Sequence, residues 1–327
     1  MKFIDTHCDS LMIALMRGGE NPDLYDASCV SVDFKRMKEG GQMAQFFAIF
    51  LPPQEAYKMM GVPEIPEEDY IAACRGILMA NLEKHSDKIS LARNAAELRA
   101  NEDAGKLSAV LSMEDGRAVW GKLKNLKQFY DMGVRALSLT WNAKNCFGSP
   151  NSREPGIMNE GLTDFGKEAV EYMQELGMLV DVSHLSDGGF KDVADICKKP
   201  FIATHSNCRA LCPHPRNLTD DMLRTLGNAG GVTGINFGPE FLNEDIECKD
   251  STAALMAKHA RHMADTGGID CVGIGSDFDG IQGNLEISDC SKVYLLEDAL
   301  KKEGFSGGEI EKIFWKNTFR VIEDAMK

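Results

Sequence analysis

Residues 2–10, KFIDTHCDS, are a short apolar run that leads directly into closely spaced polar side chains. Successive side chains of a β-strand point to opposite faces, so Asp5, His7 and Asp9 would share one face and Cys8 would point the other way. A doubly wound open sheet usually carries a glycine-rich phosphate turn after its first strand, and this stretch has His-Cys-Asp instead. One imidazole and two carboxylates on the same face of a strand would form either a buried hydrogen-bonded cluster or half of a metal site.

The composition is that of an ordinary globular protein. Hydrophobic residues make up 43% and charged residues 26% of the 327 residues, which argues against long disordered segments. No repeat, low-complexity tract or Gly/Ser linker divides the chain, so we expect one domain over residues 1–327. The net charge of −14 argues against nucleic acid or an anionic membrane as a partner.

Ten cysteines are scattered from Cys8 to Cys290 without the dense spacing of a disulfide scaffold. The first ten residues lack the apolar core of a signal peptide, and no run approaches transmembrane length. These patterns predict a reduced, cytoplasmic protein without a membrane anchor.

Hydrophobic patterning predicts eight strands, most of them followed by a helix. The expected strands are residues 2–7, 41–50, 107–114, 134–141, 178–184, 200–205, 231–237 and 271–278, and the clearest helices are 70–85, 162–177 and 251–267. The proline-containing residues 51–70 are expected to form a long connection after the second strand. This alternation in a chain of this length predicts an α/β protein with a (β/α)₈ TIM barrel, with a doubly wound open sheet as the alternative.

Imidazoles and carboxylates stand at or near the ends of several expected strands. They are His7, Asp9, Glu114, His184, His205 and Asp277. The C-terminal ends of barrel strands meet at one mouth, where active sites form, so these side chains would face a common centre. Such a cluster needs countercharge, and no lysine or arginine lies beside these residues in the sequence.

A divalent metal would supply that countercharge. Mixed histidine and carboxylate ligation suits zinc or, less selectively, manganese, cobalt or nickel. Five ligands around a central Glu114 would hold two ions with the glutamate between them, and a one-metal site stays open.

Six segments occur in order along nearly the whole chain and are distinctive together. They are DTHCD (5–9), SMEDG (112–116), DVSHLSD (181–187), ATHSNCRAL (203–211), PRNL (215–218) and GIDCVGIGSDFDG (268–280). The sequence resembles the membrane (renal) dipeptidase family, a group of binuclear zinc peptidases built on a metal-dependent hydrolase barrel.

The resemblance implies a role for each matched residue. His7 and Asp9 would hold one zinc ion, His184 and His205 the other, and Glu114 would bridge the two. Asp277 would be the acid/base, Arg216 would grip the terminal carboxylate of the substrate, and Asp279 would have a supporting role. A surface ion pair is the alternative for Arg216.

The activity that the resemblance implies is hydrolysis of free dipeptides, including those with a D-residue at the C-terminal side, by a hydroxide that bridges two zinc ions. It also implies a homodimer. Lipid anchoring, which animal relatives show, lacks a matching signal peptide and hydrophobic C-terminal tail.

Two positions depart from the family pattern. Many relatives carry a histidine after the fourth strand, where this chain reads LSLTWNAKN and places Trp141. Indole donates one hydrogen bond but neither accepts one nor titrates near pH 7, so Asn142 or Asn145 would have to supply a donor. Gly238 replaces a tyrosine that contacts substrate in some relatives. Both changes indicate an altered substrate preference.

Two other functions remain open. A deaminase or lactonase of the same superfamily, acting on a small amide or lactone, typically shows His-x-His after strand one and a metal-binding lysine after strand four. This chain has His7-Cys8-Asp9 and no lysine at the end of that strand. The second alternative is a metal-binding barrel with altered catalysis, which only Trp141 favours.

Several other histidines and cysteines are residue types that can bind metal, but they are not expected among the ligands at the mouth of the barrel. His259 and His262 share one face of an outer helix, which predicts packing or surface contacts. Cys208 and Cys212 are expected to be structural. His85 is expected at a helix end, where it interacts with the helix dipole.

Overall fold

Eight parallel strands form a closed barrel in the computed structural model of the chain, which describes residues 1–61, 63–245 and 247–327. The barrel strands are β1 (Phe3–Cys8), β2 (Gln42–Phe50), β4 (Leu107–Glu114), β5 (Val134–Ser138), β6 (Leu179–Asp181), β7 (Ile202–Ala203), β8 (Val232–Ile235) and β10 (Val272–Ile274). β1 pairs with β2 on one side and with β10 on the other, and β2 also pairs with β4, so the sheet closes on itself. The predicted TIM barrel is confirmed.

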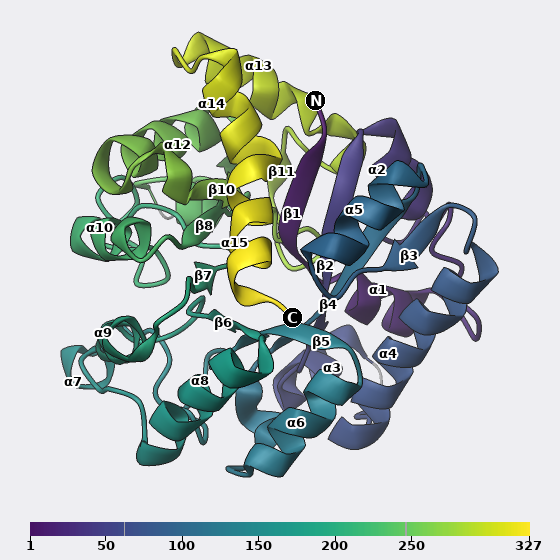
Figure 1. Cartoon of the computed structure of the whole chain (residues 1–327), viewed down its shortest axis with the longest axis horizontal. Helices are drawn as coiled ribbons and strands as arrows, with labels where there is room; N and C mark the ends of the chain where they lie inside the picture. Colours follow the sequence, from purple (N-terminus) through teal and green to yellow (C-terminus); the bar gives the residue numbers. More distant parts are fainter. Residues whose placement is uncertain (62, 246) are drawn as a thin grey trace.

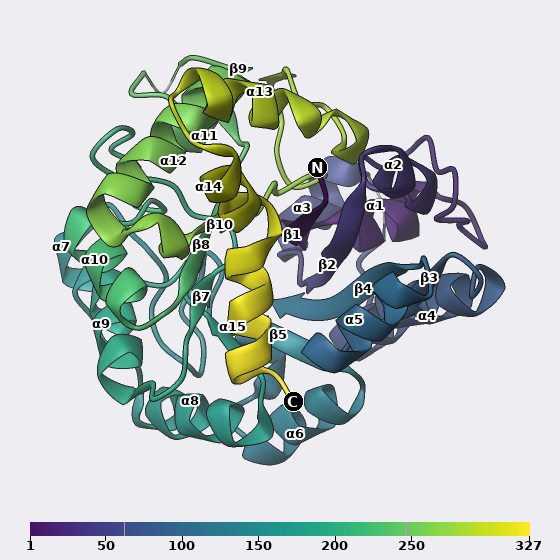
Figure 2. The ribbon, with the colours of Figure 1, turned by 45° about the horizontal axis from the view of Figure 1, so that its top comes forward.

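Helices surround the strands, as Figures 1 and 2 show from two directions. The larger ones are α1 (Ser10–Arg17), α4 (Glu67–Lys84), α5 (Ala95–Asp103), α6 (Leu123–Asp131), α8 (Asp164–Leu176), α9 (Asp187–Ile196), α10 (Asp220–Asn228), α12 (Ala253–Gly267), α13 (Tyr294–Lys302) and α15 (Asn317–Ala325). Shorter helical segments are α2 (Phe34–Glu39), α3 (Gln54–Met60), η1 (Gly116–Val119), α7 (Pro155–Met158), α11 (Pro239–Leu242), η2 (Ile269–Cys271), η3 (Cys290–Lys292), α14 (Gly307–Glu311) and the π-helical turn η4 (Lys312–Lys316).

The three clearest predicted helices correspond to α4, α8 and α12, each within three residues at either end. α8 begins where its sequence indicates, because the hydroxyl of Thr163 accepts a hydrogen bond from the Gly166 N–H. The prediction of one long connection over residues 51–70 is wrong in part, since this segment contains α3 and the first turn of α4. Residue 62 of that segment lies outside the described residues.

Three short strands escaped the sequence prediction. β3 (Ile89–Leu91) pairs with the beginning of β4, outside the closed barrel. β9 (Asp250–Ser251) and β11 (Asn284–Leu285) pair with each other. Strands of two or three residues are too short for an alternating pattern to stand out.

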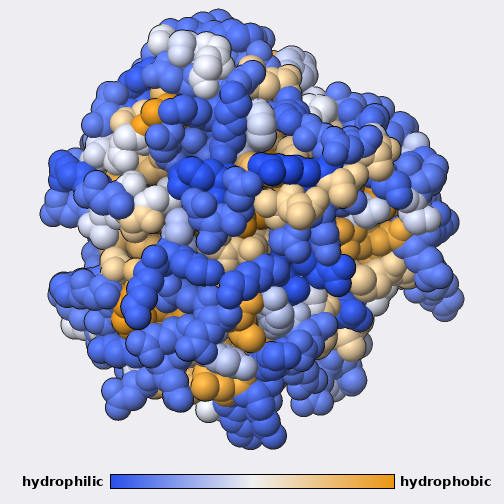
Figure 3. Space-filling view, in the orientation of Figure 1, coloured by the Kyte–Doolittle hydropathy of each residue, from blue (hydrophilic) through white to orange (hydrophobic). Residues whose placement is uncertain are grey.

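One end of the barrel is closed by α15, which crosses the strands in both views (Figures 1 and 2). Phe319, Val321 and Ile322 of this helix pack in one buried apolar cluster with Ile4 of β1, Phe46 of β2 and their counterparts on neighbouring strands. We call this end the base. Figure 3 shows the same side of the molecule, where hydrophilic side chains predominate and hydrophobic ones form separate groups. The apolar contacts of the base are therefore internal.

The opposite end holds the C-terminal ends of the strands, and we call it the mouth. Small residues let the strands approach closely there: a Cβ on Gly275 would lie 1.8 Å from the Thr204 carbonyl oxygen. The Thr6 hydroxyl lies 2.5 Å from the carbonyl oxygen of Thr204 and 3.0 Å from that of Ile274, so its one proton ties β1 to the segments after β7 and in β10. These contacts bring together residues that lie far apart in the sequence.

Candidate metal centre

The six predicted side chains all reach the mouth, although most stand just beyond the strands rather than in them. His7 lies in β1 and Glu114 is the last residue of β4. Asp9 is the N-cap of α1, while His184, His205 and Asp277 follow β6, β7 and β10 by two or three residues. All six are at least 92% buried.

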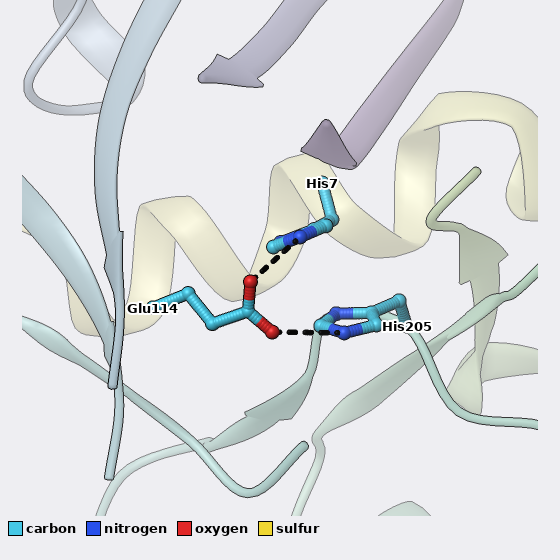
Figure 4. Close-up of side chains that lie close together, drawn as sticks. All are labelled: His7, Glu114 and His205. Carbon is cyan, nitrogen blue, oxygen red and sulfur yellow. Dashed lines mark ion pairs between the residues drawn. The ribbon is translucent and has the colours of Figure 1, made fainter. Parts of the chain in front are cut away.

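Glu114 lies at the centre of the three imidazoles. Its Oε2 is 3.4 Å from His7 Nε2, and its Oε1 is 2.9 Å from His184 Nε2 and 3.5 Å from His205 Nε2. Figure 4 shows the carboxylate reaching from its strand towards His7 and His205, whose rings stack at a centroid distance of 3.9 Å. The two oxygens of one carboxylate thus face two different sets of nitrogen atoms.

Two further carboxylates complete the cluster on the side of His7. Asp9 Oδ1 and Asp277 Oδ1 each lie 3.7 Å from His7 Nε2. Among the described residues, two groups of potential ligand atoms are compact enough for a metal ion: His7 with Glu114 and His205, and His7 with Asp9 and Asp277.

The hydrogen bonds of the cluster test whether a cation fits. His7 Nε2 and Asp9 Oδ1 are buried without any hydrogen-bond partner. His184 Nε2 and His205 Nε2 lie 3.2 Å apart, and the Nδ1 atoms of these rings contact Asn142 Oδ1 and Thr204 Oγ1. With a proton on each Nδ1, both Nε2 lone pairs face each other and Glu114. Buried acceptors that converge without donors are the arrangement that a metal ion satisfies.

The electrostatics of the cluster also favour positive charge among its carboxylates. Burial acts to lower the pKa of His7, but the carboxylates of Glu114, Asp9 and Asp277 outweigh it and raise that pKa to about 10. Burial raises the pKa of Asp277 to about 7. Burial lowers the pKa of His184 to about 4, and Arg216 adds to this effect.

Several residues at the mouth have backbone conformations that non-glycine residues rarely adopt. The φ angles are +78° at Asp115, +68° at His184, +63° at Asp277 and +71° at Asp279. Such conformations cost of order 1–3 kcal/mol each and persist where the surrounding structure enforces them. Two of these residues belong to the cluster, so its geometry is held against local backbone preference.

Arg216 is buried beside the cluster, so the alternative of a surface ion pair is wrong. It is 6% exposed, and it donates to the Ser206 hydroxyl and to the His205 carbonyl oxygen, both at 2.9 Å. Its Nε is buried without a hydrogen-bond partner. A guanidinium with an unused donor beside the ligand cluster is suited to bind a carboxylate.

The residues after β5 take different positions. Trp141 packs edge to face on Phe50 at 5.0 Å between ring centroids and lies 6.0 Å from the His184 ring. Asn142 is exposed but accepts from His184 Nδ1 at 3.2 Å. Asn145 does not supply a free donor, because its amide group donates to Asp115 and to the Leu139 carbonyl oxygen.

Two aspartates of the conspicuous segments lie outside the cluster. Asp5 does not join His7 and Asp9, because its carboxylate accepts from the N–H and hydroxyl groups of Ser276 at 2.9 and 2.6 Å. Asp279 accepts from the Ser31 N–H at 2.8 Å and from the Ser10 hydroxyl. Both connect segments of the mouth.

Sequence reasoning missed the polar residues around the cluster. Asn236, just after β8, donates to Asp277 Oδ2 at 2.8 Å. Asp181 and Thr204 lie behind His205, and Thr204 Oγ1 is 2.8 Å from His205 Nδ1. The signal was available, since each is a polar residue at the end of an apolar strand segment, the rule that found the histidines.

The other conspicuous residues have structural contacts. His259 is buried, accepts from the Cys208 N–H and contacts the Leu242 carbonyl oxygen at 3.1 Å. His262 pairs with Asp220 at 2.7 Å. His85 is the C-cap of α4, as predicted, and pairs with Asp23.

Fold and site together define a barrel hydrolase with a buried cluster of potential metal ligands. The sequence profile of the membrane dipeptidase family, peptidase family M19, matches residues 1–327. The chain belongs to this family and is a metallo-dipeptidase, as its resemblance implied.

Similar proteins and solved structures agree with this assignment. Dipeptidase verJ of Clonostachys rogersoniana is 31% identical over 307 residues, which cover 93% of this chain and 78% of that protein. The crystal structure of dipeptidase AC, a metallopeptidase of family M19, is 30% identical with a TM-score of 0.88 and covers 99% of this chain and 98% of that one.

A metallopeptidase of Rhodobacter sphaeroides, crystallised with a phosphinate mimic of the dipeptide L-Ala-D-Ala, is also 30% identical with a TM-score of 0.88. The match covers 99% of each chain. Within the described part of this chain, no helix combines the length and apolar character needed to cross a membrane.

Proposed function

We propose that the chain is a binuclear zinc-dependent dipeptidase that hydrolyses free dipeptides, including those with a D-residue at the C-terminal side. One observation carries the proposal: Glu114 lies between two sets of imidazoles, with Oε2 towards His7 and Oε1 towards His184 and His205. The bound analogue of the Rhodobacter sphaeroides relative supports the L,D-dipeptide as substrate class.

His7 and Asp9 would hold one zinc ion, His184 and His205 the second, and Glu114 would serve both. Other divalent metals suit the same mixed donor set. When bound, such ions lower the pKa of a coordinated water to about 7 and polarise a carbonyl group. The chain's own residues position the substrate and move the protons.

Asp277 is the proposed acid/base. Asn236 holds its Oδ2, which leaves Oδ1 facing His7 across 3.7 Å. Asp277 would accept a proton from the attacking water and deliver it to the nitrogen of the departing amine. The backbone conformation at Asp277 and the hydrogen bond from Asn236 both restrict where that carboxylate can lie.

Arg216 is the proposed clamp for the terminal carboxylate of the dipeptide, because its Nε is a buried donor without a partner. Trp141 and Phe50 would form an apolar wall beside His184 and so restrict the side chain of the substrate. Asn142 would act on substrate only through His184, whose ring it contacts.

A deaminase or lactonase function has less support. The first lysine after β5, Lys144, is exposed and pairs with Glu160 at 2.7 Å, which does not place it among the ligands. A barrel with altered catalysis would bind metal without cleaving dipeptides.

A panel of dipeptides assayed with and without a chelator separates these functions, together with metal content per chain by elemental analysis. We expect about two zinc-type ions per chain and cleavage of L,L- and L,D-dipeptides that stops on chelation. Metal-loaded protein that cleaves lactones or amides but no dipeptide would contradict the proposal, as would protein that binds no metal after reconstitution with zinc or manganese.

Three further features remain part of the proposal. Residues 1–327 would act as one catalytic domain, the protein would form a homodimer, and its location would be cytoplasmic. Sedimentation velocity of the purified protein tests the dimer, and cell fractionation tests the location.

A further inference from the structure

Behind His205 lies the buried carboxylate of Asp181, whose hydrogen bonds come from Ser138, Ser183 and Thr204 and not from the proposed ligands. Asp181 is 1% exposed. Its Oδ1 accepts from the N–H groups of Ser183 and Thr204, both at 2.9 Å. Its Oδ2 accepts from the hydroxyl of Thr204 at 2.6 Å and from the hydroxyl of Ser138. All four of these partners are donors, so both carboxylate oxygens of Asp181 act as hydrogen-bond acceptors.

This arrangement sets the direction of the hydrogen bond to His205. The Thr204 hydroxyl donates its one proton to Asp181. Towards His205 Nδ1, 2.8 Å away, it can therefore only accept a hydrogen bond. Ser183 Oγ, 3.3 Å from Thr204 Oγ1, accepts from the His205 N–H and is free to donate to Thr204. His205 therefore carries its proton on Nδ1, and its Nε2 lone pair faces Glu114 and His184.

We propose that Asp181 and Thr204 are positioning residues that fix the tautomer of His205 and strengthen it as a metal ligand, a role that rests on the proposed function. A carboxylate behind a ligating histidine orients the ring and increases its basicity, and here a threonine hydroxyl transmits the effect.

The second histidine of the pair has a weaker support. His184 Nδ1 contacts the neutral amide oxygen of Asn142 at 3.2 Å, and Asn142 is exposed to solvent. A neutral, hydrated acceptor orients a ring less strongly than a buried hydroxyl backed by a carboxylate. Loss of the Asn142 side chain should therefore weaken metal binding less than loss of the Thr204 hydroxyl.

The hydrogen-bond chain from Asp181 through Thr204 to His205 is here called the relay. Substitution of Asp181 by asparagine reverses the direction of its hydrogen bonds. The two backbone N–H groups at Oδ1 require an acceptor, so the new amide nitrogen would face Thr204 Oγ1. Thr204 would then accept from Asn and donate to His205 Nδ1, which moves the ring proton to Nε2. In that tautomer Nε2 has no lone pair for a metal ion.

The test is the zinc and cobalt affinity of the metal-depleted full chain, measured by competition with a chelator. We expect about 10- to 100-fold weaker binding for Thr204→Val and at least as large a loss for Asp181→Asn, with Thr204→Ser close to wild type. Thr233→Val is the matched control, because Thr233 is also fully buried but its hydroxyl donates to the Ser206 carbonyl oxygen. The cobalt absorption spectrum should change in Thr204→Val and not in Thr233→Val.

The outcomes separate the relay from the metal site. Wild type that binds metal while Thr204→Val binds it equally well, with the same cobalt spectrum, would overturn the relay and leave the proposed function intact. Wild type that binds no metal would overturn both. If a variant does not fold, the ¹⁵N NMR spectrum of the histidines in metal-free wild type decides: we expect His205 to be protonated on Nδ1, and protonation on Nε2 would overturn the relay.

Discussion

The two ends of the barrel are built from the same strands and differ in what they bury. At the base, Ile4, Phe46 and their neighbours meet α15 in an apolar cluster that hydrophobic burial stabilises. At the mouth the same strands continue into buried carboxylates and imidazoles, some of them on strained backbone. The base therefore contributes stability and offsets the cost of the buried polar groups at the mouth, a division that is general for TIM barrels.

The largest expected effect comes from the mouth. Asp277→Asn should lower dipeptidase kcat/KM by about 10²- to 10⁴-fold, because the asparagine amide cannot take up and release a proton. Metal content should stay that of wild type, since the proposed ligands are untouched. The measurement is steady-state kinetics beside elemental analysis. Equal activity of the two proteins would remove Asp277 from the proposed mechanism.

A change at the base should act on stability alone. Ile322→Ala removes a fully buried side chain of α15 and should lower the free energy of unfolding by roughly 2–5 kcal/mol. Ile157→Ala is the matched control at a residue that is 40% exposed, where a much smaller loss is expected. Denaturant unfolding measures both. A change in kcat of folded Ile322→Ala would show that the two ends are coupled.

Metal removal should destabilise the mouth without touching the base. A ligand that binds only the folded state stabilises it by about 2.7 kcal/mol at a concentration 100 times its Kd. Thermal unfolding with zinc and with chelator should therefore differ, by the same free energy in wild type and in Ile322→Ala. A stability that does not respond to the metal would argue that the cluster is formed without it.

The smallest effect on the free energy of unfolding is expected at an exposed ion pair, Lys84 with Asp23, which lies in neither the base cluster nor the ligand cluster. The hydrogen bond from Lys84 lowers the pKa of Asp23 from 3.8 to about 2. Its contribution is thus present above about pH 3.8 and disappears as the pH falls through about 2. Because the side chain is 45% exposed, we expect less than about 1 kcal/mol between wild type and Asp23→Asn at pH 5, shrinking at lower pH.

Denaturant unfolding of these two proteins between pH 5 and pH 3 checks that expectation. A difference that grows as the pH falls would reverse the sign assigned to Asp23.

The sequence predicts the barrel and its mouth well because apolar patterning locates strands and strand ends meet in a barrel. Glu114 ends β4 as predicted, and the other proposed ligands and the acid/base all reach the mouth. Strand alternation failed at Asp5, whose carboxylate goes to Ser276, because pairing along β1 is irregular between Asp5 and Cys8. A regular two-residue period does not hold across such a shift.

What the sequence does not contain is the conformation of the turns. His184 and Asp277 each stand three residues past their strands with positive φ, a conformation that their residue types tolerate more often than most but do not specify. The Asp181–Thr204 contact likewise depends on two strands lying side by side. Local patterns specify which residues reach the mouth, and tertiary packing decides which atoms meet.

The pairing of β1 with β10 also has a consequence for the order of folding. The Asp277 N–H donates to the His7 carbonyl oxygen at 3.2 Å, across 270 positions of sequence. Contacts between such distant segments form late, because the chain must first lose the entropy of closing a long loop. The first two candidate ligands leave the ribosome long before their partners, so metal capture by the complete cluster would mark the moment at which the barrel closes.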